Sequence, residues 1–333
     1  MVKKQRKNGM DERLINDIKT AYGLELSDIR PIDGGWLNHK WYARSGFHEL
    51  LIKQFSRERY DDRKLSQINT ALSWQAELYS MDVPCPKILM PRDGSPMRFC
   101  GELCYMIMEF AGGCIGDRLT VNEDQLYSLG SACALMKRGY ARLSGSVDIA
   151  AVKGYPLGSD EIITSLQKYR DKLTCVSNGI SDARFVSAVR QISRIVDSLD
   201  ISWLNSLERG LAHEDFSPDN MLFYPDKLSA ILDFDRSQYS LVLHDIGRIL
   251  TSLALDTENG FDLSRVRAFM HGYGDITMHD IADAVRCVWL IEAPWWINGR
   301  EYFYATPKVR RFCDELLWIS EHYFELDDIF VRK

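Results

Sequence analysis

The chain has 333 residues, and 46% of them are hydrophobic, which is enough to build one large domain or two smaller lobes around a sizeable core. Charged residues make up 26% and the formal net charge is -6, so no basic surface is expected that could hold a nucleic-acid backbone. The charge balance instead suits a neutral or cationic ligand. The sequence therefore favours a globular protein and disfavours a nucleic-acid partner.

The spacing of the cysteines and the most apolar segments indicate the cellular compartment in which the protein is expected. Eight cysteines are scattered without CxxC spacing, which argues against a zinc knot or a disulfide framework and favours the reducing cytoplasm. The basic stretch 1–10 runs directly into charged residues, so no secretory signal is expected. Charged and polar side chains also interrupt the most apolar window, residues 241–255. We therefore expect no membrane partner, and the sequence leaves the oligomeric state open.

The first third of the chain predicts a set of strands with two helices. Asp33-Gly34-Gly35 and Ser45-Gly46 are tight-turn sequences, and the aromatic and branched residues around the second turn are typical of a β-hairpin. A later segment has apolar residues at helical spacing and ends before two prolines. The expected elements are a helix over 10–22, strands over 29–32, 39–44 and 48–55, a helix over 60–80, and strands up to Phe110.

The pattern changes after the short connector Phe110-Ala111-Gly112-Gly113. Long helical patterns follow it, interrupted by a strand-rich stretch over 211–234. Strands first and helices afterwards indicate an α+β architecture. We expect a small β-rich lobe over 1–111, a hinge at about 109–113, and a larger, mostly helical lobe over 112–333. The expected helices of that lobe are 121–142, 158–174, 183–207, 241–255, 262–273, 277–292 and 308–325.

Two polar clusters lie between apolar strands in the second half of the chain. Residues 211–223 place Asp215 and Asn220 in one loop, and Asp233 follows the next hairpin. These side chains can converge on one metal-bound phosphate group. Asp215 can accept or orient a hydroxyl proton, whereas the oxygens of Asn220 and Asp233 suit magnesium. The alternative is that His213, Asp215 and Asn220 are ordinary turn and capping residues between strands, as Asp and Asn often are.

These segments resemble the aminoglycoside phosphotransferase and choline kinase family, which has a bilobal, protein-kinase-like fold. The family's catalytic loop, His-Gly-Asp followed by Pro-x-Asn and an apolar strand, is similar to residues 213–222. Its metal motif is similar to residues 232–235. The resemblance implies ATP and Mg²⁺ as cofactors, with GTP left open as the nucleotide. The implied roles are catalysis by Asp215, metal binding by Asn220 and Asp233, and structural support of the site by His213 and Asp245.

The first lobe matches the family less sharply. Gly34, Gly35 and Asn38 resemble the hairpin over the nucleotide phosphates, where small residues let backbone amides approach the anion. A Gly-Gly turn is also common between any two strands. Lys53 lies where the family has its phosphate-binding lysine, although a strand lysine is usually solvated. The segment that resembles the adenine-binding hinge comprises Met108, Glu109, Phe110 and Ala111. The alternative is that it is a plain core strand.

Two positions depart from the family pattern. The family has a glutamate on the helix after Lys53, and the nearest candidate partner here is Glu77, which lies almost two helical turns late. Glu214 stands where the family has glycine. Its carboxylate contacts a cationic substrate or points into solvent, and the sequence leaves both alternatives open.

The acceptor site is poorly defined by the sequence. Aromatic residues gather with Glu292 and Glu301 over 289–304, and rings with carboxylates can surround an ammonium group. An aromatic-rich helical pair is more often ordinary core. The candidate substrate-binding residues are Glu214, Asp235, Trp295 and Trp296.

Three functions are compatible with these patterns. The main interpretation is an ATP- and Mg²⁺-dependent phosphotransferase that moves the γ-phosphate to a hydroxyl of a small molecule, which is aminoglycoside-, choline-, amino-alcohol- or sugar-like. The second is a bacterial Ser/Thr protein kinase of the same fold. The third is a catalytically silent binding protein, motivated by the missing helix glutamate and by Glu214. No P-loop, HExxH or GxSxG sequence occurs that would favour another enzyme class.

Overall fold

A computed structural model describes residues 9–32, 38–92, 94–145, 158–177, 183–298 and 306–331. The chain divides into two compact units. The first comprises Met1–Cys114 and Ser229–Arg236, and the second comprises Ile115–Leu228 and Ser237–Lys333. No sequence pattern indicates that residues 229–236 return to the first unit.

An antiparallel sheet of six strands forms the centre of the first unit. The strand order is β1-β2-β3-β6-β4, and β5 pairs with β6 outside this path. The predicted hairpin is present, with Ser45 opposite His48 and Gly46 in the left-handed region that its turn requires. The strands are β1 (Ser27–Pro31), β2 (His39–Ser45), β3 (His48–Gln54), β4 (Ile88–Leu89), β5 (Arg98–Cys100) and β6 (Leu103–Glu109).

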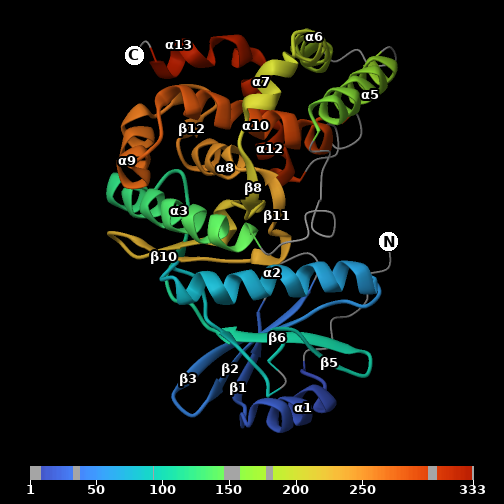
Figure 1. Ribbon diagram of the computed structural model, residues 1–333, viewed down its shortest axis with the longest axis vertical. Helices are drawn as coiled ribbons and strands as arrows, with labels where there is room; N and C mark the ends of the chain where they lie inside the picture. Colours follow the sequence, from blue (N-terminus) through green and yellow to red (C-terminus); the bar gives the residue numbers. More distant parts are fainter. Residues whose placement is uncertain are drawn as a thin grey trace. The chain divides into compact units, whose positions relative to one another are not determined.

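Helices α1 (Glu12–Tyr22) and α2 (Asp62–Ser80) cover opposite faces of this sheet (Figure 1). Successive side chains of a strand point to opposite faces, so β6 contributes to two separate cores. Its residues Leu103, Tyr105 and Ile107 pack with α1. The alternate residues Cys104, Met106 and Met108 pack with α2. The sheet therefore has two buried faces, and a polar side chain that points to either face needs a partner.

The segment 229–236 joins the first unit through main-chain contacts. The N–H of Ile231 in β10 (Leu228–Ile231) donates to the carbonyl of Pro84 at 2.8 Å. The hydroxyl of Ser229 donates to the carbonyl of Gly112 at 2.6 Å. A 3₁₀ turn, η2 (Phe234–Arg236), follows. These bonds fix the position of the loop that carries Asp233.

The second unit is mostly helical, and α10 (Met278–Trp296) forms its centre. Every residue of α10 from Ile281 to Leu290 is buried, as expected for a helix with neighbours on all sides. The other helices are α3 (Glu123–Ser144), α5 (Ser159–Ser177), α6 (Ala183–Asp197), α7 (Ile201–Ser206), α8 (Leu243–Leu253), α9 (Leu263–Tyr273), α12 (Pro307–His322) and α13 (Leu326–Val331), with 3₁₀ turns η1 (Pro218–Asn220) and η3 (Tyr323–Glu325).

Short strands connect the helices of this unit. Strands β8 (Arg209–Ala212) and β11 (Gln238–Leu241) pair antiparallel, with Ala212 opposite Gln238. This pair positions the loop that begins at His213 and the start of α8. The remaining strands are β7 (Cys114–Ile115), β9 (Met221–Phe223), β12 (Leu255–Asp256) and β13 (Gly260–Phe261). The sheet-plus-helices architecture confirms the predicted α+β fold.

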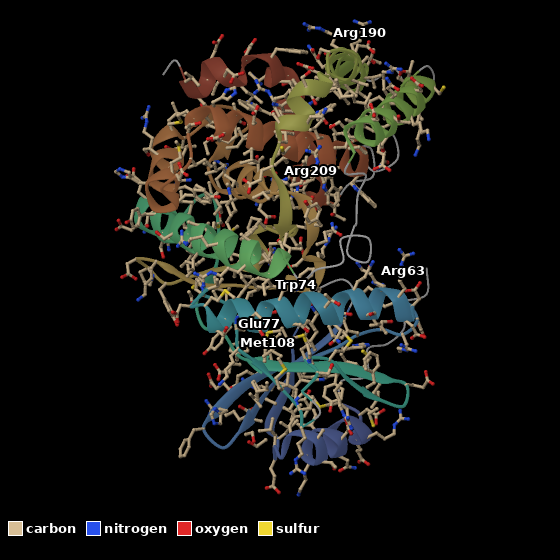
Figure 2. The ribbon with its side chains drawn as sticks, in the orientation of Figure 1. Arg63, Trp74, Glu77, Met108, Arg190 and Arg209 are labelled. Atoms are coloured by element: carbon tan, nitrogen blue, oxygen red, sulfur yellow. The ribbon has the colours of Figure 1, made fainter. Side chains whose placement is uncertain are left out.

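The expected single helix over 183–207 is wrong, because the chain breaks between α6 and α7. Asp200 ends the break: its side chain accepts the N–H of Ser202 at 2.8 Å and so starts a new helix. At the other end of α7, the guanidinium of Arg209, a residue labelled in Figure 2, donates to the carbonyls of Leu204 and Leu207. Side-chain bonds at both ends therefore make α7 a separate element. Among the described residues, no helix is both long and apolar enough to cross a membrane.

Candidate active site

In the first unit, the buried ammonium group of Lys53 is held by two carboxylates. Lys53 lies on β3 opposite Met106, on the sheet face that α2 covers, and it is 2% exposed. Its Nζ lies 2.5 Å from Oδ1 of Asp233 and 2.5 Å from Oδ2 of Asp235. A buried ammonium is costly without such partners. The site thus brings one cation together with two anions that follow it by 180 and 182 residues in the sequence.

The backbone at Asp233 brings both carboxylates to the lysine. Asp233 has φ of 64°, a left-handed conformation that aspartate tolerates better than most residues do. The ammonium of Lys40 lies 3.6 Å from the second oxygen of Asp233 and was not anticipated from the sequence. Burial would lower the pKa of Lys53, but the charges of Asp233 and Asp235 raise it above its ordinary value. Burial raises the pKa of Asp235, and Asp233 adds to this effect while Lys53 opposes it.

The proposed partnership of Glu77 with Lys53 is wrong. Glu77 lies near the C-terminal end of α2, with an exposed side chain (Figure 2). The ammonium of Lys53 instead contacts Asp233 and Asp235, which satisfy its charge. The physical reason is that a buried lysine pairs with the carboxylates nearest to it in space, and the return of residues 229–236 supplies two.

The predicted nucleotide-binding residues of this unit are only partly described. Gly34 and Gly35 lie outside the described residues, and Asn38 is half-buried just before β2. Met108 is buried towards α2. The N–H groups of Glu109 and Phe110 already donate to the carbonyls of Lys87 and Glu49, each at 2.9 Å. In this segment, Ala111 is therefore the next residue whose N–H could serve a purine.

In the second unit, Asp245 fixes the loop that follows β8. Its two carboxylate oxygens accept the backbone N–H groups of His213 at 2.7 Å and Glu214 at 2.8 Å. The N–H of Asp215 donates to Nδ1 of the buried His213 ring at 3.2 Å, so this nitrogen is an acceptor. Asp245 lies in the first turn of α8, so these hydrogen bonds attach the loop to a buried helix. The start of the loop is thus fixed by side-chain bonds to its backbone.

Asn220 closes the other end of the same loop. Its Nδ2 donates to the carbonyl of Asp215 at 2.8 Å, and its own N–H donates to the carbonyl of Ser217 at 2.9 Å. Because Nδ2 makes the first bond, the side-chain oxygen Oδ1 is the atom that could bind a cation. The side chain of Asn220 is buried while Asp215 is half-buried. The loop therefore presents one carboxylate and one amide oxygen from a rigid turn.

Glu214 does not point into solvent, and that alternative is wrong. Its side chain is 1% exposed, and Oε1 lies 3.3 Å from Nδ1 of His244. The two atoms lack the alignment of a hydrogen bond, so the contact is an ion pair. Nε2 of His244 lies 3.0 Å from Oε1 of Glu292 on α10. Glu214 is directed inwards because this buried imidazole lies between two carboxylates.

The buried charges shift one another's pKa values strongly. Burial would lower the pKa of His244, but Glu214 and Glu292 raise it to about 10. Burial would raise the pKa of Glu292, but Arg248 and His244 lower it to about 2. Burial raises the pKa of Asp245 to about 7, and the charge of Glu214 adds to this. His244 is therefore an imidazolium at neutral pH, with a carboxylate on each ring nitrogen.

The alternative of an aromatic cage around an ammonium group is not supported at Glu292, the one of its two candidate carboxylates that the structure describes. Glu292 is paired with His244 and with Nη1 of Arg248 at 2.9 Å, so its charge is already balanced. Trp296 stacks on Phe312 with ring centroids 4.9 Å apart, whereas Trp295 is 63% exposed. Adjacent helical residues point in different directions, so these two tryptophans do not line one face. Glu301 and the aromatic residues at 302–304 lie outside the described residues.

The ionic network around His244 was not predicted from the sequence. In the sequence, His244, Asp245 and Arg248 interrupt an apolar window over 241–255, and the family resemblance gives a role to Asp245 alone. A stronger signal was present, because three charged or titratable residues in an apolar helix require buried partners. Glu292 is one of these partners, and its position on α10 could not be paired with α8 from sequence spacing alone.

Comparison with known proteins gives consistent matches. A model of the phosphotransferase enzyme family matches residues 28–284. A homoserine kinase of a Bradyrhizobium strain is 27% identical over 203 residues, which cover 61% of this chain and 57% of that protein. A homoserine kinase of Acidiphilium cryptum is 26% identical over 265 residues, which cover 78% of this chain and 77% of that protein. The chain thus spans little more than half the length of the first of these relatives.

Solved structures share the fold at low sequence identity. An aminoglycoside phosphotransferase of Alicyclobacillus acidocaldarius is 13% identical, with a TM-score of 0.69 and 100% of both chains covered. An amicoumacin kinase in complex with AMP-PNP and Ca²⁺ is 13% identical, with a TM-score of 0.64 and 96% of both chains covered. A spectinomycin phosphotransferase in complex with ADP and spectinomycin is 15% identical, with a TM-score of 0.62, and the match covers 96% of this chain and 100% of the other.

Proposed function

Because the chain belongs to the phosphotransferase enzyme family, we propose that it is a kinase that transfers the γ-phosphate of a nucleoside triphosphate to a hydroxyl group of a small molecule. The geometry of the loop at 213–220 carries this proposal. Asp245 holds the start of that loop, and Asn220 holds the carbonyl of Asp215. A carboxylate on a preorganised turn is what in-line attack by a hydroxyl requires, since the reaction depends on positioning more than on a strong base.

Each of the polar residues has a distinct role in this proposal. Asp215 accepts and orients the proton of the acceptor hydroxyl. The ammonium of Lys53 would bind the nucleotide phosphates, which compete with Asp233 and Asp235 for this cation. Oδ1 of Asn220 and the carboxylate of Asp233 are hard oxygen donors, which fit Mg²⁺ and not a thiophilic metal. The metal, when bound, neutralises charge that develops on the phosphates.

We propose ATP as the nucleotide and an amino-bearing alcohol as the acceptor. The curated relatives are named homoserine kinases, and one structural neighbour is an aminopropanol kinase, so both names specify an alcohol with an amino group. The net charge of -6 supports an acceptor that is neutral or cationic. All eight cysteines are free thiols, which supports a reducing, cytoplasmic location.

The test is nucleotide-dependent turnover on a panel of acceptors. ADP or GDP release would be measured with homoserine, aminopropanol, choline, aminoglycosides, sugars and serine-containing peptides. We expect release with an amino alcohol, and a loss of about 10²–10⁴-fold in Asp215→Ala because the hydroxyl loses its proton acceptor. Asp226→Ala is the matched control, since Asp226 is an exposed aspartate in the turn between β9 and β10.

Two results would contradict the proposal. Release that depends only on peptides would make the chain a protein kinase. No release with any acceptor, together with no thermal stabilisation by ATP or GTP with Mg²⁺, would make it a binding protein that retains the fold, since a ligand of the native state must raise its stability.

A further inference from the structure

Glu214 has a backbone conformation that its side chain does not favour. Its φ is 65°, in the left-handed region. The other non-glycine residues with positive φ in the described part of the chain are Asp28, Asp82 and Asp233. Aspartate tolerates this region because its short polar side chain can bond locally, whereas glutamate gains no such benefit. A specific interaction must therefore compensate for a glutamate at this position.

The side chain of Glu214 supplies that interaction in the interior of the second unit. Oε1 lies 3.3 Å from Nδ1 of His244, and Nε2 of Gln238 donates to Oε2 at 3.4 Å. His244 is 3% exposed, and its other ring nitrogen lies 3.0 Å from Glu292. The imidazolium thus joins the loop to α10 through two carboxylates. Without Glu214, a buried cation would lose one of its two anionic partners.

This contact is the first link of a longer ionic chain. Glu292 also pairs with Arg248, and Arg248 pairs with Glu315 on α12. Arg311 completes the chain through the other oxygen of Glu315 at 2.8 Å. Carboxylates and cations alternate along the whole chain, so each buried charge lies beside the opposite charge. The loop is therefore connected to α8, α10 and α12 by a continuous series of ion pairs.

We propose that Glu214 is a positioning residue for the Asp215 carboxylate, acting through its ion pair with His244. This inference rests on the proposed kinase function. Asp245 binds the N–H groups of residues 213 and 214, whereas the next peptide N–H makes a longer bond of 3.2 Å to the His213 ring. The ion pair of the Glu214 side chain restrains the backbone of residue 214. This restraint sets the direction in which the next side chain, that of Asp215, points. A displacement of about 1 Å at such a group can lower turnover by about 100-fold.

Three variants test this role by turnover. Glu214→Gln removes the charge at constant shape, Glu214→Gly removes both the strain and the anchor, and His244→Gln removes the partner. We expect each to lower kcat by about 10- to 100-fold with the KM for nucleotide unchanged. Asp283→Asn is the control, since it removes another buried carboxylate of α10 whose bonds run to Trp203 and Arg286.

The double variant separates positioning from plain stability. If Glu214 acts through His244, Glu214→Gln with His244→Gln should have nearly the kcat of either single variant, because both changes remove the same contact. Additive losses of kcat would overturn the proposal. So would a Glu214→Gly protein with the turnover of the wild type, or an Asp283→Asn protein with an equal loss.

A readout without turnover distinguishes failure of this inference from failure of the proposed function. Amide hydrogen exchange over residues 211–223 would be measured in the full-length wild type, Glu214→Gln, Glu214→Gly and Asp283→Asn. We expect faster exchange in this loop for both Glu214 variants and not for the control, because the anchor limits local opening. If the wild type phosphorylates no acceptor, faster exchange still supports the anchor, and unchanged exchange overturns it.

Discussion

The Lys53 ammonium lies 2.5 Å from a carboxylate oxygen of Asp233, although 180 residues separate the two in the sequence. Asp235 binds the same ammonium from the same loop. Two adjacent carboxylates repel each other, and a cation between them removes that repulsion. Lys53 therefore neutralises both carboxylates, and a divalent ion would compete with its ammonium group for the same oxygens.

We predict that Lys53→Met makes the stability of the protein depend on divalent cations. Removing the ammonium leaves the partly buried charges of Asp233 and Asp235 without their main counter-charge, which should lower the free energy of unfolding by about 3 kcal/mol. Mg²⁺ without nucleotide should restore part of this loss. Urea denaturation with and without MgCl₂ measures both effects.

Lys40→Met is the matched control for that experiment. Its ammonium lies 3.6 Å from Asp233 with a side chain 23% exposed, so its loss should cost below about 1 kcal/mol. Two results would contradict the assignment of Lys53 as the main counter-charge. One is an equal loss of unfolding free energy in both variants, and the other is a Lys53→Met protein whose unfolding free energy does not change with Mg²⁺.

Asn220→Ala should raise the concentration of Mg²⁺ needed for half-maximal turnover. The change removes the proposed metal ligand and also the bond from Nδ2 to the carbonyl of Asp215. We expect kcat to fall by about 10- to 100-fold and the nucleotide-induced thermal shift in Mg²⁺ to shrink. Asn259→Ala, in the exposed turn between β12 and β13, should leave both quantities unchanged. An unaltered Mg²⁺ dependence in Asn220→Ala would remove this residue from the metal site.

Local patterns were sufficient to predict most secondary structure. The hairpin around Gly46 follows from a left-handed turn residue between two branched and aromatic runs. The helix expected over 60–80 from apolar spacing and the two following prolines is observed over Asp62–Ser80. The break before α7 was missed because Asp200 competes with the helix through its own side chain. Such a bond leaves no mark on the apolar periodicity.

The partners of buried charges could not be predicted in the same way. The sequence predicts Asp233, Asp235 and Lys53 as separate site residues, yet their mutual contact depends on the return of a distant segment to the sheet. The inward direction of Glu214 depends on His244, which no sequence spacing pairs with it. Long-range pairing of charges is set by tertiary structure, and a single sequence carries no periodic signal for it.

Stability at alkaline pH should depend on His244. Its pKa in the folded protein is about 10, above its ordinary value of 6.5, since Glu214 and Glu292 outweigh the effect of burial. The stabilisation is therefore complete below pH 6.5 and is lost as the pH rises through 10. We expect the unfolding free energy of the wild type to fall more steeply from about pH 7 to about pH 10 than that of His244→Gln, by up to about 1.4 kcal/mol per pH unit.

Chemical denaturation at several pH values measures the two slopes. Buried thiols such as Cys85 also lose stabilisation in this range, because burial raises their pKa, but they are common to both proteins and cancel in the difference. Parallel slopes for the wild type and His244→Gln would mean that His244 is neutral in the folded protein.

Gly247→Ala should destabilise the protein because α8 and α10 touch at this glycine. A Cβ at Gly247 would lie 2.0 Å from the carbonyl oxygen of Ala284 and 2.7 Å from Cγ2 of Val288, so the two helices would have to move apart. Overpacking of this kind costs about 1–3 kcal/mol, measurable by urea denaturation. Gly145→Ala is the control, since Gly145 has helical dihedrals and open space where the added methyl group would lie, and it should be neutral or slightly stabilising.

The same substitution also tests whether α8 transmits its position to the catalytic loop. Asp245 lies two residues before Gly247 and holds the N–H groups of His213 and Glu214. A shift of α8 should therefore lower kcat in Gly247→Ala under conditions where the variant remains fully folded. If the variant is destabilised but keeps the turnover of Gly145→Ala, the loop adjusts independently of α8, and the bracing by Asp245 is not required for activity.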